Sequence, residues 1–268
     1  MELGSMSAAA MAGMGFSVLV SVGLPVFLML YWRKRTKAKV QFFFIGGGIF
    51  ILSAMILEQM CHMLVFGLAG DILQKNFLLA SLYSGLAAAV FEETGRFLAM
   101  KIFIRHKKYT VDNKSALMYG IGHGGAESIL LVGIANINNL TTSVMLNSGA
   151  LAAQVEELEG NVKTQALQNI QQLVSTPASL FYLAGIERIF AVILQIALTV
   201  LVYLGVKHAK KQMVLLAYLG HFLVDFLVVT ISGKLNIIAA ECLVAALTAA
   251  VAGAAFLLWQ KYENDGDR

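Results

Sequence analysis

Ionisable side chains interrupt three of the most apolar stretches of this chain, and they do so at helical spacing. The side chains are Glu92, Glu93 and Arg96 in the first stretch, His123 and Glu127 in the second, and His221 and Asp225 in the third. Residues three or four apart share one face of a helix, so each stretch presents its polar groups together. Tyr119 lies one turn before His123 and shares that face.

This set of side chains suits the hydrolysis of a peptide bond inside a membrane. Such a reaction needs a base that activates water, a group that polarises the carbonyl and a proton donor for the leaving amine. A carboxylate, with a second carboxylate beside it and histidines opposite, can fill these roles. Two histidines and a carboxylate could instead hold a zinc ion that activates the water. The residue types allow both chemistries.

The composition places these stretches in a membrane protein. Of the 268 residues, 58% are hydrophobic and 13% are charged, with a mean hydropathy of +0.74. Soluble domains are about a quarter charged. The sequence therefore predicts an all-α, integral membrane protein built as one domain over residues 1–268.

Apolar runs long enough to cross a bilayer predict a bundle of about seven transmembrane helices. They cover residues 14–32, 40–67, 77–104, 115–135, 178–205, 212–232 and 235–259. Residues 136–176 are polar by comparison, and we interpret them as an extracytoplasmic segment with one or two amphipathic helices. An ordinary helical loop and a lid over a substrate site are the two interpretations of this segment.

Basic residues alternate between the loops. Fifteen of the 20 Lys and Arg residues lie at or beyond the C-terminal ends of the first, third, fifth and seventh runs, including Lys101, Lys107, Lys108, Lys211 and Arg268. The opposite loops hold only Lys75, Lys163 and Lys234. The positive-inside rule predicts an N-terminus outside and a C-terminus in the cytoplasm, and an odd number of spans fits this alternation.

The three polar stretches also agree in depth. Counted from the expected inner ends of their helices, Glu92, His123, His221 and Asp225 lie about 12–20 Å into the membrane at 1.5 Å per residue. We therefore expect them to meet in one layer. Glycines at 46–48 and 120–125 allow close helix packing, a substrate passage, or both.

Glu92-Glu93-Thr-Gly-Arg96, Tyr119-xxx-His123 and His221-Phe-Leu-Val-Asp225 resemble the motifs of the CAAX-processing and bacteriocin-processing membrane proteases. Within that group the chain is most similar to the YhfC branch of intramembrane peptidases. The resemblance covers residues 77–232, which we take as the catalytic core. It implies that Glu92 or Glu93 activates water, while His123 and His221 serve the oxyanion or the leaving group.

Two departures from the family pattern leave roles open. Arg96 is one residue nearer the glutamates than in the commonest form of the motif, so either glutamate could be its partner. Asp225 stands where Asn is common, and it could donate when protonated, orient His221 or bind metal. The pattern assigns no role to Glu127.

The sequence thus predicts an intramembrane protease of glutamic type, which requires no cofactor. A zinc-dependent protease using the same residues is one alternative, and a proton- or cation-coupled transporter is another. The expected substrate is a membrane protein or lipid-anchored peptide, and the expected location is the cytoplasmic membrane of a bacterium. We expect no nucleic-acid partner, and the sequence makes no prediction of the oligomeric state. Motifs of zincins, serine hydrolases, P-loop and dinucleotide-binding proteins are absent from the sequence.

Overall fold

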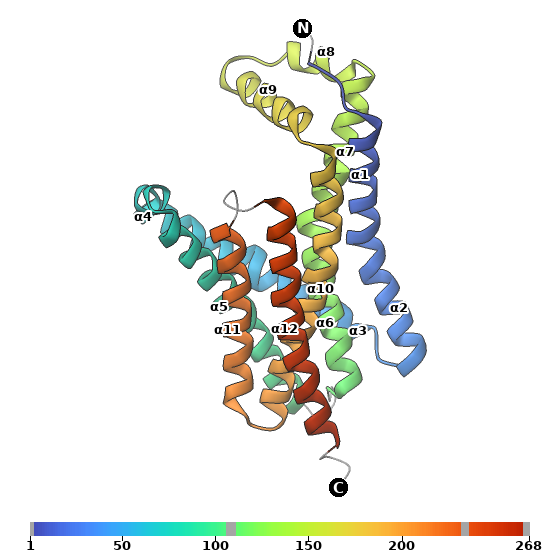
Figure 1. Ribbon diagram of the computed structural model, residues 1–268, viewed down its shortest axis with the longest axis vertical. Coiled ribbons are helices and arrows are strands. Elements are labelled where there is room, and N and C mark those ends of the chain that lie inside the picture. The colour runs from blue at the N-terminus through green and yellow to red at the C-terminus, as the bar shows by residue number, and fades with distance from the viewer. Residues whose placement is uncertain (1–2, 106–110, 232–235, 265–268) are drawn as a thin grey trace. The chain divides into compact units, whose positions relative to one another are not determined.

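The computed structural model describes residues 3–105, 111–231 and 236–264, and these residues are helical almost throughout, with no strand among them (Figure 1). The helices are α1 (Ala8–Val18), α2 (Leu24–Thr36), α3 (Gln41–Phe50), α4 (Gln59–Lys75), α5 (Phe77–Arg105), α6 (Asn113–Glu127), α7 (Ile134–Asn147), α8 (Ala150–Glu156), α9 (Gly160–Ser175), α10 (Ala178–Lys207), α11 (Lys211–Ile231) and α12 (Ile237–Asn264). Short π-helical segments, η1 (Leu19–Gly23), η2 (Ile51–Glu58) and η3 (Ser128–Gly133), join consecutive helices without a break. The predicted all-α class is confirmed.

Six helical stretches in the described part of the chain are long and apolar enough to cross a membrane. They are Ala8–Thr36, Gln41–Lys75, Asn113–Asn147, Ala178–Lys207, Lys211–Ile231 and Ile237–Tyr262. α5 is 29 residues long but is not among the six, and Glu92, Glu93 and Arg96 interrupt its apolar run. The chain is an integral membrane protein, and the seventh span, across α5, stays a prediction.

The span predicted over residues 115–135 continues further as a helix than its hydropathy suggests. Residues 136–147 were expected in the polar segment, but they continue the helix as α7. Their polar side chains bond within the helix: Asn136 Nδ2 donates to the Val132 carbonyl at 3.1 Å, and Ser143 Oγ donates to the Asn139 carbonyl at 2.7 Å. Such local bonds let polar residues continue a helix. The connection expected over residues 136–176 is therefore shorter than predicted, and its two amphipathic helices are α8 and α9.

The described helices form two compact units. The first comprises Met1–Leu24 and Ser128–Ile189, and the second comprises Pro25–Glu127 and Phe190–Arg268. In the first unit, α1 packs along α7, and α9 buries Ile170 in an apolar cluster with Met6, Met14 and Leu146. The amphipathic face of α9 is thus covered by its own unit.

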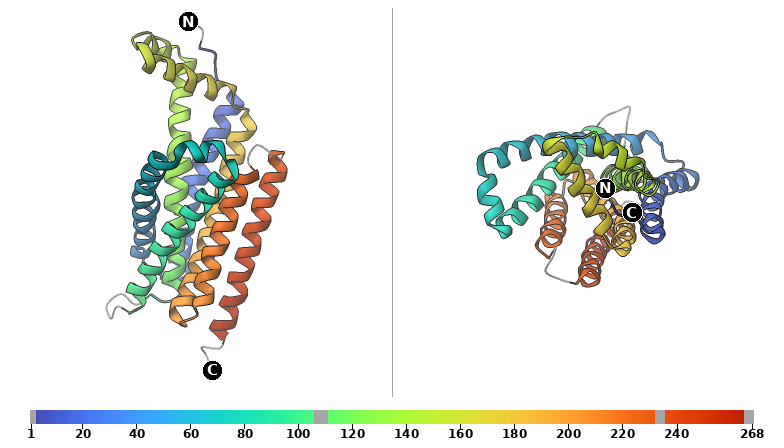
Figure 2. Two further views of the ribbon diagram at one scale, coloured as in Figure 1. Left: turned by 90° about the vertical axis from the view of Figure 1, so that its left-hand side faces the viewer. Right: turned by 90° about the horizontal axis from the view of Figure 1, so that it is seen from above.

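The second unit holds every residue that the sequence marked as a candidate for chemistry. In it α5 runs side by side with α11, and α3 crosses α6 (Figures 1 and 2). Glycines permit the crossing: a Cβ on Gly46 would overlap the Tyr119 carbonyl oxygen, and one on Gly122 would overlap the Phe43 carbonyl oxygen. α6 also rests on α10, where a Cβ on Gly124 would lie 2.9 Å from Gln195 Cβ. These contacts support the packing interpretation of the glycines.

The basic loops of the second unit gather at one end of its helices. Trp32 Nε1 donates to the Lys114 carbonyl at 2.9 Å, and Lys207 Nζ donates to Asn113 Oδ1 at 3.0 Å, so the ends of α2, α6 and α10 meet. The grouping of Lys and Arg inferred from the loop alternation is present here in space. Lys107, Lys108, Lys234 and Arg268, which also entered that prediction, lie outside the described residues.

Candidate active site

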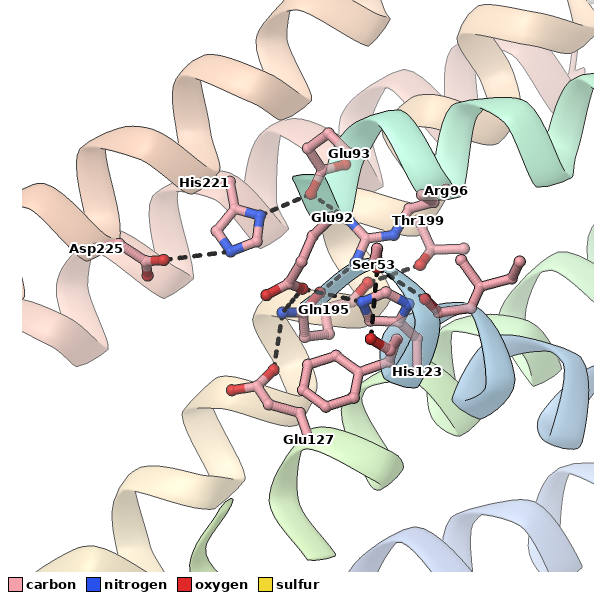
Figure 3. A network of polar contacts seen from close by, with 12 residues as sticks. Ser53, Glu92, Glu93, Arg96, His123, Glu127, Gln195, Thr199, His221 and Asp225 are labelled. Carbon is pink, nitrogen blue, oxygen red and sulfur yellow. Dashed lines mark hydrogen bonds and ion pairs between the residues drawn. The ribbon is translucent and has the colours of Figure 1, made fainter. Parts of the chain in front are cut away.

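The ion pair of α5 is buried at the centre of the second unit. Glu93 and Arg96 are both fully inaccessible to solvent, and Arg96 Nη1 donates to Glu93 Oε1 within the helix (Figure 3). The sequence left open which glutamate Arg96 contacts, and the structure places it on Glu93. A charge this deep in a protein needs such a partner, because removal from water is costly.

Glu92 points to different partners. Its Oε2 lies 3.0 Å from Nε2 of His123 on α6 and accepts a hydrogen bond from Gln195 Nε2 at 3.1 Å. Glu92 and His123 are both buried, with relative exposures of 6% and 0%. The crossing of α3 over α6 packs Phe50 edge-on against the His123 ring, with centroids 5.4 Å apart, so the imidazole is held in place.

His221 on α11 is oriented from both edges of its ring. Nδ1 lies 2.7 Å from Glu93 Oε1, and Nε2 lies 3.4 Å from Asp225 Oδ2, one helical turn further along α11 (Figure 3). The close contact of α5 with α11 at Gly85, where a Cβ would lie 2.8 Å from the Phe226 nitrogen, brings the two helices near enough for this. Of the three roles open to Asp225, the geometry favours orienting His221.

Gln195 on α10 connects the two halves of the cluster, and our sequence reasoning missed it. Its Oε1 accepts from Arg96 Nη2, while its Nε2 donates to Glu92 Oε2 and, at 2.8 Å, to Glu127 Oε2. Glu127 therefore joins the cluster through Gln195. The signal was one amide within the apolar run AVILQIALTV, which a search for ionisable groups passes over.

Four buried polar atoms of the cluster have no hydrogen-bond partner among the described residues. They are Glu93 Oε2, Tyr119 Oη, His123 Nδ1 and Arg96 Nε. Tyr119 stacks on His123 with centroids 6.1 Å apart, so the Tyr119 hydroxyl belongs to the same pocket of polar groups. Buried polar atoms are almost always paired in folded proteins, and orphaned ones mark positions where function is worth seeking.

A second polar group adjoins the cluster. Glu58, at the end of η2, lies 3.3 Å from Nε2 of His62, whose Nδ1 lies 2.7 Å from Tyr83 Oη. Glu58 is near enough to Glu92, His221 and Asp225 to interact with them electrostatically. The structure therefore places Glu58 at the border of the cluster. π-helical turns such as η2 are frequent beside functional sites.

The comparisons with known proteins identify the family. A family model described as YhfC intramembrane metalloprotease matches residues 19–248, which include every residue of the cluster. The chain is also 34% identical over 204 residues to the Uncharacterized membrane protein YhfC of Bacillus subtilis (strain 168), covering 75% of this chain and 76% of that protein. The chain belongs to the YhfC intramembrane metalloprotease family. No solved structure matches it.

The YhfC family name implies a metal, and the residues present can be tested for one. Zinc sites in proteins use three or four Cys, His or carboxylate ligands converging on one point. Among the described residues no three His, Cys, Asp or Glu side chains converge in this way. His123 faces Glu92, His221 faces Glu93 and Asp225, and Arg96 brings a fixed positive charge to Glu93. The arrangement of these described residues does not fit an assembled metal site.

Proposed function

We propose that this member of the YhfC family is an intramembrane peptidase in which Glu92 activates the hydrolytic water. The observation that carries the proposal is the contact of Glu92 with His123 and Gln195 in a buried cluster. Both contacts are to neutral or titratable partners, whereas Glu93 is tied to the permanent charge of Arg96. Of the two glutamates, Glu92 is therefore the one free to gain and lose a proton.

The proposed reaction proceeds by general base and general acid catalysis. Glu92 takes a proton from water as the water oxygen attacks the carbonyl carbon of the peptide bond. The carbonyl oxygen becomes negatively charged, and the C–N bond breaks as Glu92 returns the proton to the amine nitrogen. A positioned base of this kind accelerates a reaction by about 10²–10⁴-fold.

Donors for the developing oxyanion are at hand in the same cluster. The Tyr119 hydroxyl is buried without a partner and lies near Glu92, Glu93 and Arg96. His123, which contacts Glu92, is the second candidate donor. Fixed donors in a site shielded from water contribute strongly, since they need no reorientation when charge appears.

The remaining cluster residues fix this geometry. Glu93 links Arg96 to His221, Asp225 orients the far edge of His221, and Gln195 holds Glu92 and Glu127 together. We propose a substrate that shares the bilayer with the site, a membrane protein or a lipid-anchored peptide. The similarity to a protein of Bacillus subtilis supports a location in a bacterial cytoplasmic membrane.

The test is a search for cleavage by the purified protein reconstituted in liposomes with membrane-anchored test peptides. Mass spectrometry should find two fragments whose masses add up to the mass of the test peptide plus one water. Glu92→Gln should abolish these products, while Glu156→Gln, at an exposed residue of α8, should not. If the liposomes instead show an ion flux that Glu92→Gln alters, and no cleavage, the protein is a transporter and the proposal is wrong.

A further inference from the structure

An apolar pocket lies between α5, α11 and the end of α10, one helical turn from the cluster around Glu92. Its volume is about 590 Å³, and its lining includes Phe97, Val214, Leu215 and Tyr218. Phe97 follows Arg96 directly, and Tyr218 precedes His221 by one turn. Pockets that hold small molecules have volumes of about 300–1,000 Å³.

Two lysines give this pocket a charged rim. Lys101 on α5 and Lys211 at the start of α11 both line it, and both side chains are exposed. Lys101 Nζ lies 5.7 Å from the centroid of the Phe97 ring, which holds the ammonium group over the pocket wall. No acidic residue is among the described residues that line the pocket. As far as the structure describes it, the pocket joins an apolar interior to a cationic edge.

The lining favours an acyl chain over a peptide. Among the described lining residues Tyr218 carries the one uncharged polar side chain, and its hydroxyl is already hydrogen-bonded to Thr94 Oγ1 at 2.8 Å. A peptide backbone in this space would bury amide groups without partners, at a cost of about 1–3 kcal/mol each. A hydrocarbon chain carries no such groups.

The place of the pocket in the unit agrees with a lipid whose headgroup is anionic. Lys101 and Lys211 belong to the end of the helices where the basic loops of this unit gather, which the loop charges predict to face the cytoplasm. Anionic lipids in the cytoplasmic leaflet attract lysines at that level, by about 1 kcal/mol for each lysine.

We infer that the pocket between α5, α10 and α11 is a binding site for one anionic phospholipid, with an acyl chain against Phe97, Val214 and Leu215 and the phosphate between Lys101 and Lys211. The inference does not depend on the proposed peptidase activity. The lipid would lie against α5 and α11, one helical turn from Arg96 and His221 of the cluster.

Native mass spectrometry of the full-length protein in detergent tests the site, with phosphatidylglycerol and phosphatidylcholine of identical acyl chains as probes. Phosphatidylglycerol should bind more tightly. Lys101→Gln and Lys211→Gln should each weaken it about fivefold, and the double variant should bind both lipids alike. Lys261→Gln is the matched control, since Lys261 is also exposed and lies 5.9 Å from an aromatic ring, that of Tyr262, but outside the pocket.

Two further variants separate the outcomes. Val214→Trp should fill the pocket and reduce binding of both lipids, while Glu92→Gln should leave lipid binding unchanged even where cleavage is lost. Equal binding of the two lipids by the unaltered protein, or unchanged binding in the double lysine variant, would overturn the inference. A photo-crosslinking residue at position 215 in native membranes should capture lipid, and capture of peptide instead would assign the pocket to substrate.

Discussion

At the scale of residues, the neighbouring glutamates of α5 have different environments. Glu93 shares one oxygen between Arg96 and His221, whereas Glu92 contacts His123 and the amide of Gln195. Adjacent residues on a helix point about 100° apart, so the two carboxylates reach different neighbours. Glu93 is paired with the fixed charge of Arg96, and Glu92 is available for proton transfer.

Glu93→Gln should therefore destabilise the protein more than it alters the chemistry of Glu92. Removing one member of a buried ion pair costs about 3–5 kcal/mol, because the remaining charge is left without compensation. Thermal unfolding in detergent should show a large fall in Tm, and Glu93→Gln combined with Arg96→Met should recover much of it. A double variant as unstable as Glu93→Gln alone would refute this account of the pair.

Gln195→Leu should reduce the rate of cleavage about 10²-fold while changing KM little. The variant removes the donor that orients Glu92 and the acceptor that holds Arg96, and displacement of a reacting group by about 1 Å is enough for such a loss. The control is Gln171→Leu, an exposed glutamine of α9. A rise in KM with unchanged kcat would assign Gln195 to substrate binding instead.

Depth along the helices predicted that Glu92, His123, His221 and Asp225 would meet in one layer. In the structure they lie in one cluster, together with Glu93, Arg96 and Glu127. The partner of Arg96 was not predictable, since both glutamates lie within a turn of it. Gln195 was not predictable either, because burying an uncharged amide in an apolar helix costs less free energy than burying a charge. A single glutamine is therefore a weaker sign of function than an ionisable residue.

At the scale of elements, the crossing of α3 and α6 positions His123. Helices approach most closely where small residues face the partner helix, and Gly46 and Gly122, which have no side chain, provide this. The sequence indicated close packing from these glycines but not their partner helices. It also ended the fourth span near residue 135, because hydropathy reports exposure to lipid and not the local hydrogen bonds that continue α7 to Asn147.

The glycine triplet of α3 offers a matched pair of variants. Gly46→Ala should lower stability by about 1–3 kcal/mol, since the new methyl group would overlap the Tyr119 carbonyl oxygen. Gly48→Ala should leave stability equal or raise it by up to about 1 kcal/mol, because a Cβ there meets no atom within 4 Å and alanine favours the helix. Thermal unfolding of the two variants side by side gives the measurement, and equal shifts would contradict the crossing.

At the scale of the whole molecule, the open question is how many times the chain crosses the bilayer. Among the described residues six stretches qualify by length and hydropathy, and α5 does not, since the charged residues of the cluster lower its hydropathy. Polar residues at membrane depth make a catalytic helix look less like a span than its neighbours. We retain seven spans because α5 runs beside α11, which does qualify.

The parity of the spans makes this testable. Seven spans place the two termini on opposite sides of the membrane, with the N-terminus outside, whereas six place them on the same side. Single cysteines introduced at Ser5 and near the C-terminus, in a background with Cys61 and Cys242 replaced, should therefore differ in labelling by an impermeant maleimide on intact cells. Labelling of both positions, or of neither, would contradict the crossing of α5.

The most direct test of the account is the cleavage rate of Glu92→Gln against that of the unaltered protein, each with and without a strong zinc chelator. If Glu92 activates the water without a metal, the substitution should reduce the rate by at least about 10²-fold. The chelator should leave the rate of the unaltered protein unchanged, and unfolding midpoints should confirm that both proteins are folded. Cleavage that survives in Glu92→Gln, or that the chelator abolishes, would contradict the central claim.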